Sequence, residues 1–107
     1  MTFEELCHRA RVTPTEIERW ASSGTLGPRL RESTEGRWRH VTKDMAERAL
    51  LTRLLLDQGL TLESVAKMAD KKKTIVKYED GLDLRIGNMI IRVDNPNALD
   101  VEEGGQG

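Results

Sequence analysis

The stretch T-E-G-R-W-R-H-V-T, at residues 34–42, does most to decide which fold we expect of this chain. It sets a glycine, two arginines, a tryptophan and a histidine between two segments that carry strong helix-start signals. Gly36 permits a tight backbone turn, and a guanidinium group can form two parallel hydrogen bonds to a phosphate. The stretch therefore predicts a short basic hairpin that can set positive charge beside a phosphate backbone.

Two helix-start signals lie before this hairpin. Thr2 precedes Glu5, and Thr13 precedes Glu16, at the spacing of a capping box, in which the hydroxyl and the carboxylate each satisfy a backbone N–H. Pro14 suits the first helical position, and apolar residues recur at the helical period in both segments. Because only a tight turn separates the two helices, they predict a helix-turn-helix.

Two further helices are expected after the hairpin. Thr42 and Thr61 are their N-cap residues, and Gly59 ends the helix that begins at Thr42. The helix at residues 42–58 carries enough aliphatic side chains to form the third helix on which a helix-turn-helix usually packs.

Beyond three consecutive lysines at residues 71–73, the apolar period changes from helical to alternating. The segments T-I-V-K-Y-E, L-D-L-R-I and M-I-I-R-V are separated by the dipeptides Asp80-Gly81 and Gly87-Asn88, which favour two-residue hairpin turns. The sequence therefore predicts a three-stranded antiparallel meander.

Turns at these dipeptides fix the register of the meander. They pair Ile75 with Ile86 and set Asp83 opposite Arg92, an attractive cross-strand pair. The apolar side chains then gather on one face, which must be buried either on the third and fourth helices or on a second subunit. We expect a homodimer contact through four residues of this face: Leu84, Ile86, Met89 and Ile91.

Composition narrows the class of protein. A chain of 107 residues forms one domain with a tail, and its net charge of −1 means that any nucleic-acid binding must rest on locally placed cations.

The single Cys7 excludes an internal disulfide and suits a reducing cytoplasm, and no stretch is apolar enough to span a membrane. Cys7 and His8 are adjacent and point apart on a helix, so we expect no metal site. No catalytic constellation or cofactor motif is present, and we expect a non-enzyme without a cofactor.

Four local patterns give the chain a family resemblance. They are A-R-V-T at residues 10–13 leading into I-E-R-W at 17–20, G-T-L-G-P at 24–28, the hairpin at 34–42, and D-Q-G-L-T-L-E-S-V at 57–65. Over about two-thirds of its length the chain resembles the MerR superfamily of winged helix-turn-helix regulators, whose wing and following cap read T-E-G-G-Y-R-R-Y-S. The hairpin is the most specific of the four patterns.

The resemblance implies that the second helix enters a major groove of duplex DNA while the wing lies over the backbone and the minor groove. Trp38 falls on the family's packing aromatic, Arg39 on its DNA-contacting wing arginine, and Arg19 on a DNA-contacting position of the second helix. An ordinary solvated hairpin face is the alternative for the wing arginines. The expected DNA-binding residues are Thr13, Thr15, Arg19, Arg29, Arg31, Arg37, Arg39 and His40.

Several features depart from the family pattern. Glu18 lies where the family usually has an arginine and Glu16 where it often has a threonine, so two carboxylates are expected to face phosphates. The meander replaces the long C-terminal helix through which members usually dimerise. The remaining residues leave no room for an effector domain, and one cysteine cannot supply the paired thiolates of the family's metal sensors.

We therefore expect a mainly α fold with a small β part: a MerR-like winged helix-turn-helix of four helices with a wing hairpin at residues 1–70, a three-stranded antiparallel meander at 71–96, and a flexible tail at 97–107. The expected function is sequence-specific binding of double-stranded DNA by a cytoplasmic transcriptional regulator. Two alternatives stay open: a phage DNA-binding protein of the excisionase or packaging type, and a protein-interaction adaptor on a repurposed fold, which Glu16, Glu18 and the nearly neutral charge favour.

Overall fold

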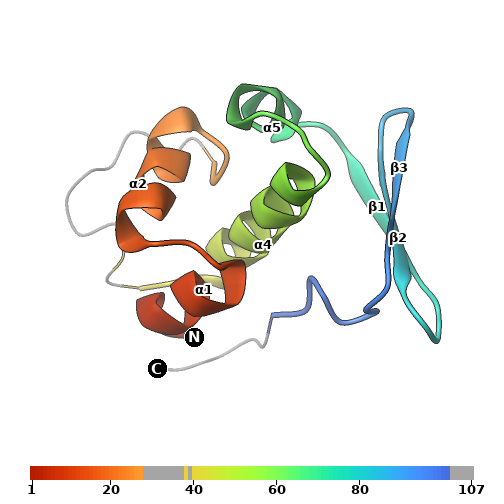
Figure 1. Cartoon of the computed structure of the whole chain (residues 1–107), viewed down its shortest axis with the longest axis horizontal. Helices are drawn as coiled ribbons and strands as arrows, with labels where there is room; N and C mark the ends of the chain where they lie inside the picture. The colour runs from red at the N-terminus through yellow and green to blue at the C-terminus, as the bar shows by residue number, and fades with distance from the viewer. Residues whose placement is uncertain (28–37, 39, 102–107) are drawn as a thin grey trace.

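The computed structural model describes residues 1–27, 38 and 40–101. In this part of the chain, helices precede a sheet in the sequence (Figure 1). The helices are α1 (Phe3–Ala10), α2 (Pro14–Ser23), α4 (Lys43–Asp57) and α5 (Leu62–Met68). The strands are β1 (Lys73–Lys77), β2 (Leu82–Ile86) and β3 (Met89–Val93), which form an antiparallel sheet in the order β1-β2-β3.

Each of these helices begins at a threonine, as the sequence predicts. Thr2, Thr13, Thr42 and Thr61 have extended backbones, and the hydroxyl of each accepts a hydrogen bond at 3.1 Å from the backbone N–H three residues later. That bond satisfies one of the amide groups that a helix leaves unpaired at its start.

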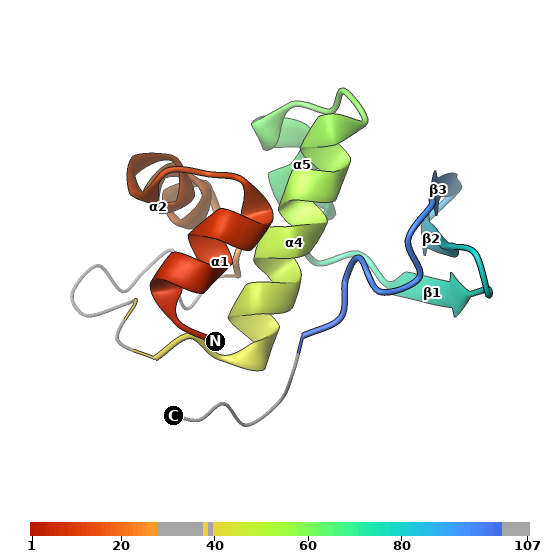
Figure 2. The ribbon, with the colours of Figure 1, turned by 60° about the horizontal axis from the view of Figure 1, so that its bottom comes forward.

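Helix α4 lies between α1 and α2 on one side and the sheet on the other, as Figure 2 shows. Its first half packs on α1 and α2 in a helical core, and Leu55 near its end belongs to a second core beneath the sheet. The buried residues of the helical core are Leu6, Cys7, Ala10, Ile17, Trp20, Ala21, Leu26, Met45, Ala46, Ala49 and Leu50. Those of the sheet core are Leu55, Val65, Leu82, Leu84, Ile86 and Ile91. Because both cores include residues of α4, this helix joins the helix-turn-helix to the sheet.

The register of the sheet confirms one predicted hairpin and corrects the other. β2 and β3 turn at Gly87-Asn88 and set Asp83 opposite Arg92, as expected. Ile75, however, pairs with Leu84 and not with Ile86. The Tyr78 N–H donates to the Gly81 carbonyl at 2.7 Å, so the turn centres one residue earlier than predicted. This moves the register by two residues, which leaves every side chain on its expected face.

Gly81 explains why the sequence misleads at this turn. Its φ is not among the positive values that hairpin glycines often adopt, and a Cβ built on it would overlap the carbonyl oxygen of Val93. The glycine is therefore needed for a close approach of two backbones and not for a left-handed turn.

Most of the apolar face of the sheet is covered by the chain itself. Leu84, Ile86 and Ile91 are no more than 6% exposed and pack with Leu55 of α4 in the sheet core, while Met89 is half-buried against it. The sequence leaves two possibilities for what buries this face, the helices or a second subunit, and here the helices bury most of it. Three of the four residues at which the sequence places a homodimer contact are thus buried within one chain. Dimerisation through this face stays a prediction.

After β3 the chain returns to α1 as an irregular segment, residues 94–101, which we call the C-terminal strap. The Arg9 guanidinium donates to the carbonyl of Asn97 at 3.2 Å, and Lys77 of β1 forms an ion pair with Asp100 at 2.6 Å. Leu99 packs against both cores. The strap includes residues 97–101, which the sequence assigns to a flexible tail, and these residues link α1 to β1. The rest of that tail, residues 102–107, lies outside the described residues.

Candidate nucleic-acid interface

Helix α2 presents a polar face away from the helical core. Ile17, Trp20 and Ala21 are buried, whereas Thr15 and Arg19 are exposed. Residues four apart lie on the same side of a helix, so Thr15 and Arg19 form one exposed strip with a hydroxyl and a guanidinium. Such a strip can donate hydrogen bonds to base edges and to phosphates.

Thr13, also expected to contact DNA, serves to start α2. Its hydroxyl accepts from the Glu16 N–H and donates to the Glu16 carboxylate, each at 3.1 Å. The same carboxylate accepts from the Thr13 backbone N–H, which completes the capping box. These hydrogen bonds, first of all that of the backbone N–H, lower the pKa of Glu16. The hydroxyl hydrogen of Thr13 is thus already donated, so Thr15 is the threonine of α2 better suited to reach a groove.

Trp38 joins the expected wing to the helix-turn-helix. Its indole N–H donates to the carboxylate of Glu18 on α2, and its ring packs against Phe3 of α1 in a tilted arrangement with the ring centroids 4.7 Å apart. The tryptophan is half-buried against the helical core, which agrees with the packing role that the resemblance implies.

The positions of Glu16 and Glu18 bear on the adaptor alternative. Both carboxylates depart from the family pattern that the resemblance implies. One closes a capping box and the other binds the indole of Trp38, so each has a role within the fold. Neither now needs a protein partner to account for it.

The basic segment, residues 28–37, lies between described residues that form hydrogen bonds to α2 or to its cap. Thr25 is buried, and its backbone N–H and its hydroxyl both donate to the Trp20 carbonyl at the end of α2. Gly27 follows at φ +103° and donates to the Gly24 carbonyl. At the other end of the segment Trp38 binds Glu18 of α2. Both flanks therefore meet α2, one at its end and one along its side.

The remaining expected contacts are placed as follows. His40 is exposed, between Trp38 and the start of α4. Four arginines that the sequence assigns to the wing lie outside the described residues: Arg29, Arg31, Arg37 and Arg39.

Sequence reasoning missed the residue that holds the helix-turn-helix on α4. The Arg53 guanidinium donates to the carbonyls of Ala10 at 2.7 Å and Arg11 at 3.2 Å, and it lies 5.3 Å from the centroid of the Trp20 ring. Its charge thereby satisfies backbone acceptors where α1 ends and the turn begins. Asp57 pairs with both Arg53 and Arg11. Arg53 and Asp57 are four residues apart, so their ion pair could be predicted from the sequence. The hydrogen bonds from Arg53 to Ala10 and Arg11 could not, because those residues are distant in the sequence.

Two negative findings apply to residues 1–27, 38 and 40–101. In these ranges no group of three or more histidine, cysteine, aspartate or glutamate side chains is arranged to hold a metal ion. No helix of the described chain has both the length and the apolar character needed to cross a membrane.

Comparison with known proteins places this geometry in a family. Neither the curated proteins nor the solved structures gave a match. A family model did match, that of the MerR HTH family regulatory proteins, over residues 1–72. This range covers the four described helices and ends one residue before β1. DNA binding in transcription regulation is the general role that such a match indicates. The chain belongs to the MerR HTH regulatory family.

Proposed function

We propose that the protein binds specific sequences of double-stranded DNA through α2 and the basic segment that follows it, and that it regulates transcription in the cytoplasm. One observation carries the proposal most directly. The described residues on either side of the basic segment contact α2 or its cap: Trp38 binds Glu18, and Gly27 binds the C-cap residue Gly24. The exposed strip of α2 is formed by Thr15 and Arg19. Arginines connected in this way to a helix can bind phosphates while the helix contacts bases.

The proposed roles divide between affinity and specificity. Arg39, with Arg29, Arg31 and Arg37, binds phosphates and fixes the orientation of the protein on the duplex. Thr15 and Arg19 reach into the major groove, where an arginine can bind both acceptors of a guanine. A single module of this size covers roughly 600–1,000 Å² of its own surface on DNA, so tight binding calls for paired sites or a second copy.

The salt dependence of binding tests the proposed phosphate contact. Arg39→Ala is expected to weaken binding to random-sequence duplex and to reduce the slope of log K against log salt by about one unit. Fluorescence anisotropy of a labelled duplex, titrated at several salt concentrations, measures this slope.

Arg85→Ala is the matched control, because Arg85 is an exposed arginine on the outer face of β2. It removes the same charge far from α2 and should leave the slope unchanged. Equal slopes for the wild type and Arg39→Ala would refute the wing contact. An equal decrease of the slope in Arg39→Ala and Arg85→Ala would show that net charge, and not a contact at Arg39, causes the effect.

Specificity needs a separate measurement. Arg19→Ala is expected to flatten the preference among sequences selected by the wild type from a random pool, and loss of a two-bond contact to a base changes discrimination by about 1–3 kcal/mol. A variant that keeps the full preference would remove α2 from base readout. That result would not affect the proposed phosphate contact of the wing, which the salt dependence of Arg39→Ala tests separately.

A further inference from the structure

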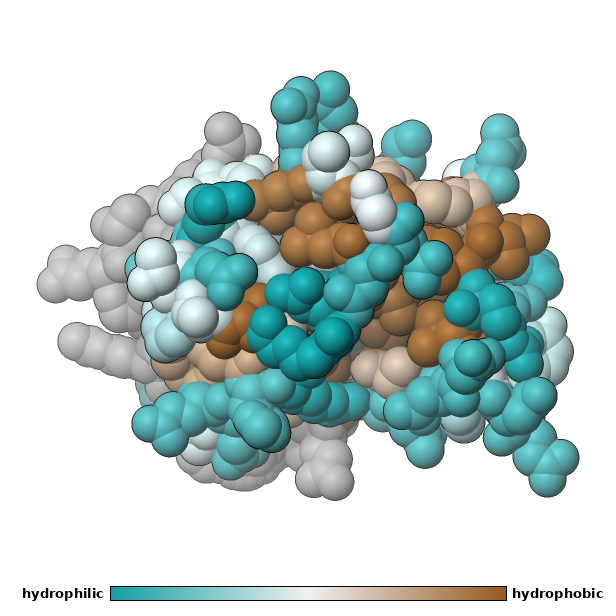
Figure 3. Space-filling view, in the orientation of Figure 1, coloured by the Kyte–Doolittle hydropathy of each residue, from teal (hydrophilic) through white to brown (hydrophobic). Residues whose placement is uncertain are grey.

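A cleft of about 1040 Å³ lies between the helices and the sheet, on the side of the molecule that the C-terminal strap crosses. Its walls are one side of α1, the first half of α4, β1 with part of β2, and the strap. Pockets for small ligands have volumes of about 300–1,000 Å³, so this cleft is large enough for one. Figure 3 shows that apolar surface gathers over the middle of the molecule and toward the sheet on the face it presents, with hydrophilic side chains among it.

The apolar part of the cleft includes a large side chain that the fold leaves uncovered. Ile75 of β1 is 47% exposed, although it lies on the inner face of the sheet beside fully buried Leu84. Half-buried Leu51 of α4 and Leu99 of the strap line the same space. An apolar group placed there would cover Ile75, which the helices do not reach, and its burial would favour binding.

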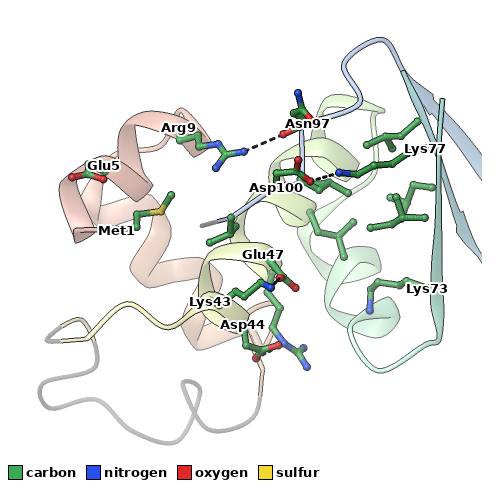
Figure 4. A pocket seen from close by; sticks show the side chains of 17 residues that line it. Met1, Glu5, Arg9, Lys43, Asp44, Glu47, Lys73, Lys77, Asn97 and Asp100 are labelled. Atoms are coloured by element: carbon green, nitrogen blue, oxygen red, sulfur yellow. Dashed lines mark hydrogen bonds and ion pairs between the residues drawn. The ribbon is translucent and has the colours of Figure 1, made fainter. Parts of the chain in front are cut away.

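Most of the charges around this apolar patch are already neutralised in pairs. Asp44 pairs with Arg48 at 3.0 Å, Glu47 with Lys43 at 3.9 Å, and Asp100 with Lys77 at 2.6 Å. Three charged residues of the cleft lie outside these pairs: Glu5 and Arg9 of α1, and Lys73 of β1. Arg9 donates to the strap, whereas Lys73 is half-buried and next but one to Ile75 in the same strand. Figure 4 shows Lys73 at the sheet side of the cleft and Glu5 on α1 at the opposite side.

The ammonium group of Lys73 has no carboxylate within ion-pair distance among the described residues. It donates instead to the carbonyls of Ala69 at 2.9 Å and Lys71 at 3.1 Å, which are neutral acceptors. An ammonium carries three N–H donors, so one remains for a further acceptor. Burial, and after it the nearby charge of Arg48, lowers the pKa of Lys73, while Asp70 and Asp44 act in the opposite direction.

From this arrangement we infer that the cleft binds a small amphipathic monoanion, an alkyl or aryl carboxylate whose charged group pairs with Lys73 and whose apolar body covers Ile75, Leu51 and Leu99. The ligand would contact α4, β1 and the strap together. This binding requires no DNA, so it stands or falls separately from the function proposed above.

Octanoate, below its critical micelle concentration, is the probe for the full-length protein without DNA. Titration followed by ¹H–¹⁵N correlation spectra should give saturable shifts that cluster in β1, the first half of α4 and the strap. 1-Octanol, which has the same chain length and no charge, should bind about tenfold more weakly, since a tenfold change corresponds to the loss of one partly shielded charge pair. Equal affinity for the two probes, or shifts scattered over the whole surface, would overturn the inference.

A matched pair of variants locates the site. Ile75→Glu places a negative charge in the cleft, whereas Ile90→Glu places it on the outer face of the same sheet, where Ile90 is 63% exposed. Octanoate affinity should fall about tenfold in the first variant and stay within about twofold in the second. Lys73→Gln is an independent variant, expected to weaken octanoate binding and to leave 1-octanol binding unchanged. Octanoate affinity unaffected by both Ile75→Glu and Lys73→Gln would show that the carboxylate does not occupy this cleft.

Discussion

The helical region, described at residues 1–27, 38 and 40–68, and the sheet region, residues 73–101, are specified in different ways. Each described helix begins at a threonine whose hydrogen-bond partner is three residues away. The sheet region depends on contacts between distant residues, such as the backbone approach of Gly81 to Val93 and the bonds from Arg9 to the strap. The family match ends at residue 72, between the two regions. The part shared with the family is thus the part with local signals, and the cleft lies where the two regions meet.

The largest effect is expected in the sheet region. Gly81→Ala would force a Cβ against the Val93 carbonyl, and because a backbone atom cannot move aside cheaply, the variant should lose about 3 kcal/mol of unfolding free energy. Gly87→Ala, in the other hairpin, meets no atom within 4 Å but has φ +59°, so a loss of about 1 kcal/mol is expected. Urea unfolding measures both. If Gly81→Ala proves no more costly than Gly87→Ala, the close approach does not constrain the sheet.

A smaller effect is expected from the residue that joins the helix-turn-helix to α4. Arg53→Met keeps the apolar stem but removes the charged hydrogen bonds to Ala10 and Arg11, at a cost of about 2 kcal/mol. Arg85→Met, at an exposed site on β2, is the control and should change the unfolding free energy little. Comparison of helical circular dichroism with a probe in the sheet during the same urea titration would show whether the two regions still unfold together. A cost equal to that of the control would contradict the role assigned to Arg53.

The smallest effect is expected at the capping box of α2, and it depends on pH. The Glu16 pKa is lower in the folded protein than its ordinary value, so the ionised carboxylate contributes stability above that ordinary value. This contribution is lost as the pH falls through the folded pKa. The stability difference between the wild type and Glu16→Ala should therefore shrink on acidification. Glu4→Ala, at an exposed carboxylate in the first turn of α1, is the reference. A difference that does not change with pH would mean that ionisation of Glu16 is irrelevant to the cap.

The two regions also differ in what their sequence reveals. The threonine caps and the alternating apolar strands depend on neighbours within a few residues, so the helix starts and the strands could be predicted. The register of the first hairpin could not be predicted. Asp80-Gly81 resembles a turn dipeptide, but Gly81 is needed because the Val93 carbonyl of β3 approaches it closely. The roles of Arg53, Glu18 and Lys73 depend on partners in other elements or on burial, neither of which a linear pattern records.

For the candidate DNA interface, the exposed strip of α2 follows from helical periodicity, and the position of Trp38 agrees with the family resemblance. The sequence predicts the capping box of Thr13 and Glu16, but only the structure shows that the Thr13 hydroxyl donates to Glu16. A hydroxyl engaged in a cap has lost the donor that a groove contact needs.

The bond from Arg9 to Asn97 has a consequence for how the chain is made. Its two residues are separated by 88 positions, so the ribosome has long released α1 when the carbonyl acceptors are synthesised. Early domains and helices can form during translation, at about 5–20 residues per second. The guanidinium of Arg9 must therefore wait several seconds for its carbonyl acceptors, so α1 can form well before the strap can bind it.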